Sequence, residues 1–194
     1  MARQRTAILI SGRGTNMAAL IAAARNPSYP AEIALVISNI PSAKGLEIAE
    51  AAGIKTLIIS HKEYSIKSMF EKRILQALNE AKIELVCLAG FMRVLSASFI
   101  SHFEGRILNI HPSLLPAYRG LDTHKRALAD GVKEHGCTVH FVVPELDAGP
   151  IIAQVKVPVL ESDTEETLSA RVLAAEINLY PDALAKVAEK LAPL

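Results

Sequence analysis

The sequence predicts an α/β protein built on a three-layer, doubly wound and mostly parallel β-sheet. Strand-like and helix-like segments alternate four times in the first half of the chain, which is the order typical of a parallel sheet. Residues 85–89 are apolar throughout, as in a strand that is covered on both faces. The 194 residues contain no repeat, low-complexity tract or linker, so we expect residues 1–194 to form a single domain.

Four strands are expected in the first half of the chain, at residues 6–11, 32–38, 56–59 and 85–89. The helix after the first strand has a natural N-cap in Thr15 or Asn16. Its apolar face is predicted to carry Met17, Leu20, Ile21 and Ala24. A second helix is predicted at 43–52 and ends at Gly53, the usual residue past a helix end. A third is predicted at 65–82, with an apolar stripe formed by Ile66, Phe70, Ile74, Ala77 and Ala81.

The second half of the chain is less regular. Short helices are expected at 96–102 and 123–130, on either side of a strand that begins at Ile107. Strands at 138–143 and 151–159 follow without a helix between them, which predicts an antiparallel segment near the C-terminus. Asp163-Thr-Glu-Glu166 resembles a capping box that opens a last helix. Pro181 is expected to break or kink that helix near Tyr180.

Composition excludes several classes of protein. The net charge of +1 lacks the basic footprint of nucleic-acid binding, and an apolar content of 51% with 21% charged residues is typical of a soluble globular chain. Cys87 and Cys137 are too few for a disulfide framework and favour a reducing compartment. No apolar run has the length of a signal or membrane-spanning segment. We therefore expect a cytoplasmic protein with no nucleic-acid or membrane partner.

The strand that begins at Ile107 carries the strongest functional signal. Asn109 and His111 point to the same face, because side chains alternate along a strand. Pro112 ends the strand, so this polar pair lies at a carboxyl end, where open α/β sheets bind ligands. Asp147, in a loop rich in turn residues, is a candidate partner that would orient the imidazole. A lone histidine is often only structural, but the shared face with Asn109 favours an active site.

The glycine-rich turn at residues 12–16 follows a strand and opens a helix, as phosphate-binding turns do. It does not match the dinucleotide fingerprint, since Met17 replaces the third glycine and Asn39 replaces the acid expected after the second strand. No nucleotide P-loop is present either. The turn is therefore either a site for a single phosphate or an ordinary connection between strand and helix.

Two further groups of polar residues are candidates for part of a site. His135-Gly-Cys-Thr-Val-His140 superficially resembles a metal cluster, but strand alternation separates its histidines, so we reject a metal site. His140 is instead predicted to line the pocket as a polar neighbour. Glu176 lies on a partly apolar helix stripe and needs a partner. That partner is either a cation, such as Arg171 or a lysine, or the hydroxyl groups of a ligand.

Five segments resemble those of the phosphoribosylglycinamide formyltransferases, folate-dependent enzymes of purine synthesis. They run in order over nearly the whole chain: Ser11-Gly-Arg-Gly-Thr-Asn16, Leu88-Ala-Gly-Phe-Met-Arg-Val-Leu95, Asn109-Ile-His-Pro-Ser-Leu-Leu-Pro116, Gly120-Leu-Asp-Thr-His124 and Leu146-Asp-Ala-Gly-Pro150. The third segment is shared with other folate formyltransferases and related hydrolases. The first and fourth segments restrict the resemblance to the phosphoribosylglycinamide formyltransferases. Val143-Pro144 departs from the family pattern and is expected to alter the mobility of the folate loop.

The resemblance implies a Rossmann-like formyltransferase fold and transfer of the formyl group of 10-formyltetrahydrofolate to glycinamide ribonucleotide in IMP biosynthesis, without a metal. It places the substrate phosphate in the N-terminal half of the chain, and the folate and the catalysis in the C-terminal half. The catalytic residues implied are Asn109, His111 and Asp147. The residues implied to bind glycinamide ribonucleotide are Gly14, Thr15, Asn16 and Glu176, and Glu176 is implied to bind its ribose. The residues implied to bind the folate are Lys67, which would bind its glutamate tail, and Met92, Arg93, Val94, Leu95 and Asn109.

Two alternative functions stay open at this point. A formyltetrahydrofolate hydrolase would share the catalytic segment, and a non-catalytic folate-binding module would share only the pocket. A methionyl-tRNA formyltransferase is disfavoured because no basic RNA-binding extension follows. The sequence allows a monomer or a homodimer, since no long exposed apolar stripe marks an interface.

Overall fold

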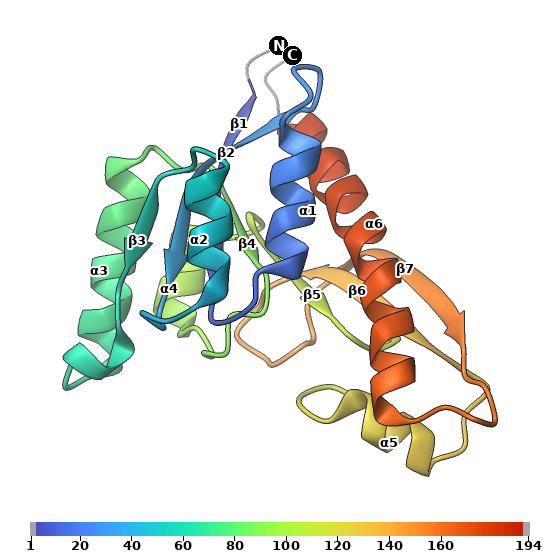
Figure 1. Cartoon of the computed structure of the whole chain (residues 1–194). Coiled ribbons are helices and arrows are strands. Elements are labelled where there is room, and N and C mark those ends of the chain that lie inside the picture. Colours follow the sequence, from blue (N-terminus) through green and yellow to red (C-terminus); the bar gives the residue numbers. More distant parts are fainter. Residues whose placement is uncertain (1–2, 192–194) are drawn as a thin grey trace.

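A seven-stranded mixed sheet forms the centre of the molecule in the computed structural model, which describes residues 3–191 (Figure 1). The strands are β1 (Gln4–Ile10), β2 (Ala31–Ser38), β3 (Thr56–Ile58), β4 (Leu85–Leu88), β5 (Ile107–His111), β6 (Glu134–Phe141) and β7 (Ile151–Pro158). Their order in the sheet is β3-β2-β1-β4-β5-β6-β7. The first five are parallel, and β6 and β7 are antiparallel to their neighbours. The predicted mixed sheet is therefore confirmed.

Helices cover both faces of the sheet. They are α1 (Thr15–Ala24), α2 (Lys44–Ala51), α3 (Lys67–Glu80), α4 (Ala97–His102), α5 (Thr123–Ala129) and α6 (Glu165–Leu191), with a short 3-10 turn at His61–Glu63. Apolar residues of α1, α2 and α6 form one buried cluster with the sheet, and those of α3 and α4 form another on its opposite face. Within residues 3–191, no helix is both long and apolar enough to cross a membrane.

The strand order reverses between β1 and β4, because the chain builds β2 and β3 on one side of β1 and returns to the other side for β4. At such a switch point the loops after two neighbouring strands diverge and leave a crevice at the carboxyl ends of the strands. The glycine-rich turn follows β1, and residues 89–95 follow β4. The fold thus brings these two segments, far apart in the sequence, to one edge of the sheet.

Three helix ends differ from the sequence-based predictions. The N-cap of α1 is Gly14, with φ of 77°, rather than Thr15 or Asn16, and no side chain caps the helix. Helix α3 begins at Lys67, because Ile66 is extended and 56% exposed instead of joining the apolar stripe. The capping box of α6 is formed by Thr164 and Thr167, each of which accepts a hydrogen bond from the backbone N–H of the other.

Two elements of the C-terminal half run further than predicted. Strand β6 begins at Glu134, four residues earlier than expected, because it pairs with β7 along its length, a contact that no local pattern reveals. Helix α6 continues through Pro181 without the predicted break. Tyr180 and Leu184 on either side of the proline are fully buried, so tertiary packing overrides the local preference.

Candidate active site

Two cavities meet at the carboxyl ends of β1, β4 and β5. The smaller, of about 280 Å³, is lined by the glycine-rich turn, by one side of α6 and by Glu176. The larger, of about 570 Å³, is lined by residues 90–95, by Asn109 and His111, and by the loop 142–147. The residues common to both linings are Gly90, Met92, Ile110, Pro112 and His124. The two cavities therefore adjoin each other.

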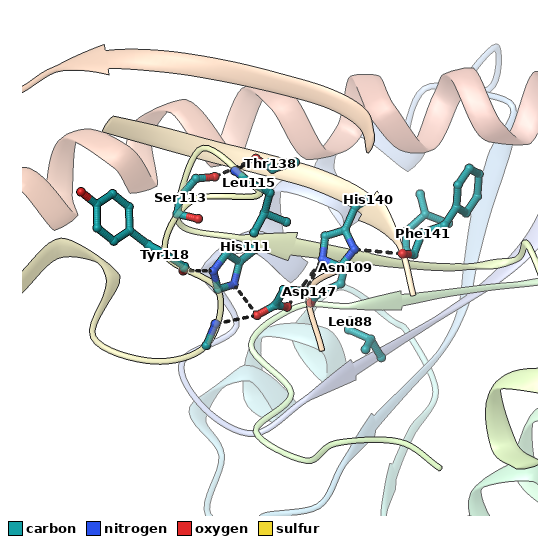
Figure 2. A network of polar contacts seen from close by, with 12 residues as sticks. Leu88, Asn109, His111, Ser113, Leu115, Tyr118, Thr138, His140, Phe141 and Asp147 are labelled. Atoms are coloured by element: carbon teal, nitrogen blue, oxygen red, sulfur yellow. Dashed lines mark hydrogen bonds and ion pairs between the residues drawn. The ribbon is translucent and has the colours of Figure 1, made fainter. Parts of the chain in front are cut away.

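His111 is held by contacts at both ring nitrogens (Figure 2). Its Nε2 donates to the carbonyl oxygen of Tyr118 at 2.9 Å, and its Nδ1 lies 3.4 Å from Oδ2 of Asp147. A carbonyl oxygen can only accept, so Nε2 carries a hydrogen. The doubly protonated imidazolium is the form that can donate to both oxygens. The side chains of His111 and Asp147 are both about 8% exposed, so water competes little with this contact.

The carboxylate of Asp147 reaches His111 because of the shape of its loop. Asp147 itself has a φ of 48°, and its Oδ2 accepts a hydrogen bond from the backbone N–H of Gly120 at 2.9 Å. Gly149 lies against the carbonyl of Phe141, so close that a Cβ there would be 1.7 Å from that oxygen. Only glycine allows this close return of the loop to β6. The predicted neighbourhood of Asp147 and His111 is present in the structure.

Asn109 is oriented by His140 on the adjacent strand β6 (Figure 2). Nδ1 of His140 donates to the carbonyl oxygen of Phe141 at 2.9 Å, which leaves the lone pair of the neutral ring on Nε2. Nδ2 of Asn109 lies 3.2 Å from that Nε2 and donates to it. Burial lowers the pKa of His140, so the neutral ring is favoured. His140 thus lines the pocket as predicted and also sets the direction of the Asn109 amide.

The loop after β5 is pinned to the antiparallel strands. Oγ1 of Thr138 donates to the carbonyl of Ser113 at 2.7 Å and accepts from the backbone N–H of Leu115 at 3.1 Å. Gln154 on β7 donates to Oγ1 of Thr138 and to the carbonyl of Leu115. These bonds fix the start of the segment that carries the Tyr118 carbonyl to His111.

The glycine-rich turn leaves the first N–H groups of α1 without a side-chain partner. Free N–H groups at a helix N-terminus favour a bound anion, and the helix dipole adds to this preference. The turn is packed against α2, since a Cβ on Gly14 would lie 2.7 Å from Cα of Gly45. Gly45 in turn donates from its backbone N–H to the carbonyl of Gly12 at 3.0 Å. Close packing of two glycines therefore gives the turn its shape.

Glu176 is buried in the smaller cavity beside the turn. Its Oε2 accepts a hydrogen bond from Nδ2 of Asn16 at 2.8 Å, so Asn16 is its partner in the protein and Arg171, one of the alternatives, is not. Arg171 is bound instead by the two carboxylate oxygens of Asp163. Burial raises the pKa of Glu176, and the bond from Asn16 opposes that rise. Oδ1 of Asn16 is buried without a hydrogen-bond partner among the described residues, which marks an unused acceptor in this cavity.

The segment 92–95 forms one wall of the larger cavity, as the resemblance implied. Met92 and Val94 are 66% and 59% exposed, an unusual state for apolar side chains beside a cavity, whereas Leu95 is buried. Lys67 is not part of either lining. It lies 3.7 Å from Glu71, which binds Ser96 directly after this wall. Lys67 is thus brought near the rim of the larger cavity rather than into it.

The chain matches the model of the formyl transferase family over residues 4–184. The chain belongs to this family. It is 45% identical to the phosphoribosylglycinamide formyltransferase of Escherichia coli over 90% of this chain and 82% of that protein. The crystal structure of phosphoribosylglycinamide formyltransferase from Brucella melitensis superposes with a TM-score of 0.93 at 55% identity, covering 99% of this chain and 98% of the other.

A longer relative contains the same region as one part of its chain. The trifunctional purine biosynthetic protein adenosine-3 of Gallus gallus is 52% identical over 95% of this chain. The chain spans 18% of the length of that relative. The family and the fold that the sequence motifs implied are both confirmed by these comparisons.

The sequence reasoning missed several residues of this candidate site. Arg13 lines the smaller cavity, and His124 lies where the two cavities meet. His124 contacts the buried His135, with 3.2 Å between Nδ1 of the first and Nε2 of the second. The Tyr118 carbonyl on His111 is a backbone contact that no residue pattern could have revealed. Arg13 could have been found, because a cation inside a glycine turn is itself a signal for an anion. No group of three or more His, Cys, Asp or Glu in residues 3–191 is arranged to hold a metal ion.

Proposed function

We propose that this chain transfers the formyl group of 10-formyltetrahydrofolate to the amine of glycinamide ribonucleotide. Tetrahydrofolate and formylglycinamide ribonucleotide are the products, as a step of IMP biosynthesis. The observation that carries the proposal is the position of Asn109, His111 and Asp147, which lie in the larger cavity next to its junction with the phosphate-type cavity. The names of the relatives at 45% and 55% identity support the same reaction.

The smaller cavity suits the ribonucleotide. The N–H groups of Gly14, Thr15 and Asn16 would hold its phosphate at the start of α1, and Glu176 would accept from the ribose hydroxyls. Arg13 is the one lysine or arginine among the described residues that line this cavity. It would offset the repulsion between the phosphate and the nearby carboxylate of Glu176.

The larger cavity suits the folate. Its wall at Met92, Val94 and Leu95 offers apolar surface for the pterin, and Arg93 lines the same wall. Lys67 at the rim would meet the negative glutamate tail. The formyl carbon would then lie beside Asn109, where the two cavities join.

The reaction begins when the amine of the ribonucleotide attacks the formyl carbon and the carbonyl electrons move onto oxygen. Asn109 donates to that oxyanion with the N–H that His140 does not use, and one such preorganised donor contributes about 10²–10³ in rate. For His111 to donate to the same oxygen, its Nε2 has to exchange the Tyr118 carbonyl for the substrate. Asp147 stays on Nδ1 and helps carry the proton from the attacking amine to N10 of the folate as the C–N bond breaks.

The decisive experiment measures release of tetrahydrofolate from 10-formyltetrahydrofolate by the purified protein. Release that depends on glycinamide ribonucleotide, with one formylated product per tetrahydrofolate, supports the proposal. Equal release without the acceptor would identify a formyltetrahydrofolate hydrolase. Binding of folate without turnover would identify a non-catalytic folate-binding module.

Variants of the catalytic residues separate these outcomes further. Asn109→Ala and His111→Ala should abolish most turnover while folate binding persists. A cytoplasmic location and a monomeric or homodimeric state stay predictions from the sequence.

A further inference from the structure

We propose that Ser11 is a positioning residue that joins the two substrate sites. Its hydroxyl lies between the end of β1 and the segment that follows β4. Oγ of Ser11 accepts a hydrogen bond from the backbone N–H of Met92 at 2.9 Å, and its own N–H donates to the carbonyl of Gly90 at 3.1 Å. Ser11 lines neither cavity, so it acts through the backbone of its neighbours.

The backbone N–H of Met92 sets the direction of the bonds that the Ser11 hydroxyl forms. A backbone N–H can only donate, so the oxygen of Ser11 accepts from Met92 and its single hydroxyl proton is left for Asn39. Oδ1 of Asn39 receives that proton at 2.5 Å. Nδ1 of His61 lies 3.1 Å from Nδ2 of Asn39 and 3.3 Å from the backbone carbonyl oxygen of Asn39, so His61 packs against the residue whose Oδ1 faces Ser11. Asn39 is only 2% exposed, so water does not replace these bonds.

This arrangement gives Asn39 a role that its position in the sequence did not suggest. In a dinucleotide-binding fold the end of the second strand would hold an acid for a ribose. Here the side chain at that position points its acceptor at Ser11 instead. The polar group at the end of β2 therefore supports the backbone around the cavities rather than binding a ligand itself.

The geometry links the sites because both backbone partners of Ser11, Gly90 and Met92, belong to the cavity walls. Ser11 directly precedes the glycine-rich turn, and Gly90 and Met92 line both cavities. A shift of the turn on binding phosphate would therefore be transmitted to the folate wall through the backbone N–H and the hydroxyl of Ser11. The identity of the two substrates rests on the proposed function, whereas the link itself rests on the contacts of Ser11.

Ser11→Ala removes the acceptor of the Met92 N–H and the partner of Asn39 at once. We expect the KM values for the ribonucleotide and for the folate to rise together, each by roughly three- to tenfold, the worth of one ordinary hydrogen bond. The kcat should stay within about twofold, because no group on the reacting atoms is changed. A rise in only one KM, or in neither, would overturn the proposal.

A second variant and a double variant test whether the residues act as one unit. Asn39→Ala should raise both KM values in the same way, and Ser11→Ala/Asn39→Ala should be no worse than Ser11→Ala alone. Additive effects would contradict the shared link. Ser11→Thr, which keeps the hydroxyl, should restore most of the affinity for both substrates.

Ser28→Ala is a matched control. It also removes a hydrogen bond between a serine hydroxyl and an asparagine Oδ1, here that of Asn26, in an exposed loop before β2. This loop lies at the amino ends of the parallel strands, away from both cavities. Both KM values should equal those of the wild type.

Amide hydrogen exchange provides a readout that does not depend on activity. In Ser11→Ala, exchange should rise together in peptides covering residues 12–16 and 90–95, while the thermal midpoint and the exchange of β7 stay close to the wild type. Unchanged exchange in 90–95, or a loss of protection throughout the sheet, would refute the local link. If the wild type shows no formyl transfer, the proposed function fails, and this exchange pattern still decides the role of Ser11.

Discussion

Replacing His140 with leucine removes the acceptor that holds the Asn109 amide while keeping an apolar side chain of similar volume. Nδ2 of Asn109 lies 3.2 Å from Nε2 of His140, and His140 is 2% exposed, so water cannot readily take its place. A fully buried donor left without a partner costs about 1–3 kcal/mol, which is the upper range for the partly buried Asn109. The amide then rotates away from the direction in which it meets the oxyanion.

Two limits set the expected fall in kcat. If the 1–3 kcal/mol penalty appears wholly in the transition state, kcat falls by about 5- to 150-fold. The upper limit is the full contribution of one oxyanion donor to the rate, which is about 10²–10³-fold. We therefore expect kcat of His140→Leu to fall by roughly 10- to 100-fold, with both KM values within about threefold of the wild type.

The assay is the initial rate of tetrahydrofolate formation with each substrate varied in turn. His140→Gln is the matched variant, because its side-chain oxygen places an acceptor near the position of Nε2, and it should recover much of the lost kcat. A leucine variant that keeps its thermal midpoint and has a wild-type kcat would falsify the orienting role of His140.

Four further outcomes follow from the site. Asp147→Asn should lower kcat by about 10²–10⁴-fold, in the range of acid–base assistance, while folate binding measured by fluorescence titration persists; a loss of binding alone would contradict this role. Arg13→Ala should raise the KM for the ribonucleotide by about tenfold, and by more at low salt, while the KM for the folate stays unchanged. Arg25→Ala, at the other end of α1, is the control and should leave both KM values unchanged. Gly45→Ala should press a methyl group on the glycine turn and lower the free energy of unfolding by about 1–3 kcal/mol in urea titrations, and an unchanged transition would refute the packing argument. Burial lowers the pKa of His135 from 6.5 to about 4, so the unfolded chain binds the extra proton at a higher pH than the folded chain does. The contribution of His135 to stability is therefore full above about pH 6.5 and is lost as the pH falls toward 4. His135→Gln should flatten this part of the profile of thermal midpoint against pH.

Periodicity was sufficient for most of the fold. Runs of apolar residues marked all seven strands, and the alternation of strands with helices predicted the parallel part of the sheet. The errors lie where tertiary contacts act against local preference. Helix α6 passes through Pro181 because the residues around it are buried, and β6 begins early because β7 lies beside it. Neither contact can be recognised from the local sequence.

Alternation along one strand was also enough to put Asn109 and His111 on the same face. Whether the carboxylate of Asp147 reaches His111 was open, because the nine-residue loop 142–150 between β6 and β7 can return to the sheet in many ways. The structure settles this placement through Gly149, whose missing side chain lets the loop lie against Phe141. The partner of Glu176 was open for the same reason. Asn16, 160 positions away, forms that contact only because α1 and α6 pack together.

The sequence by itself therefore determined the class of the fold, the candidate catalytic residues and the family to which the chain belongs. These depend on local periodicity and on short motifs, which are readable without coordinates. Only the tertiary structure decided which atoms meet: Nδ1 of His111 with Asp147, Asn109 with His140, and Ser11 with Asn39 and the backbone of Met92. The physical reason is that hydrogen bonds have a range of about 3 Å and a direction, so they depend on the packing of distant segments.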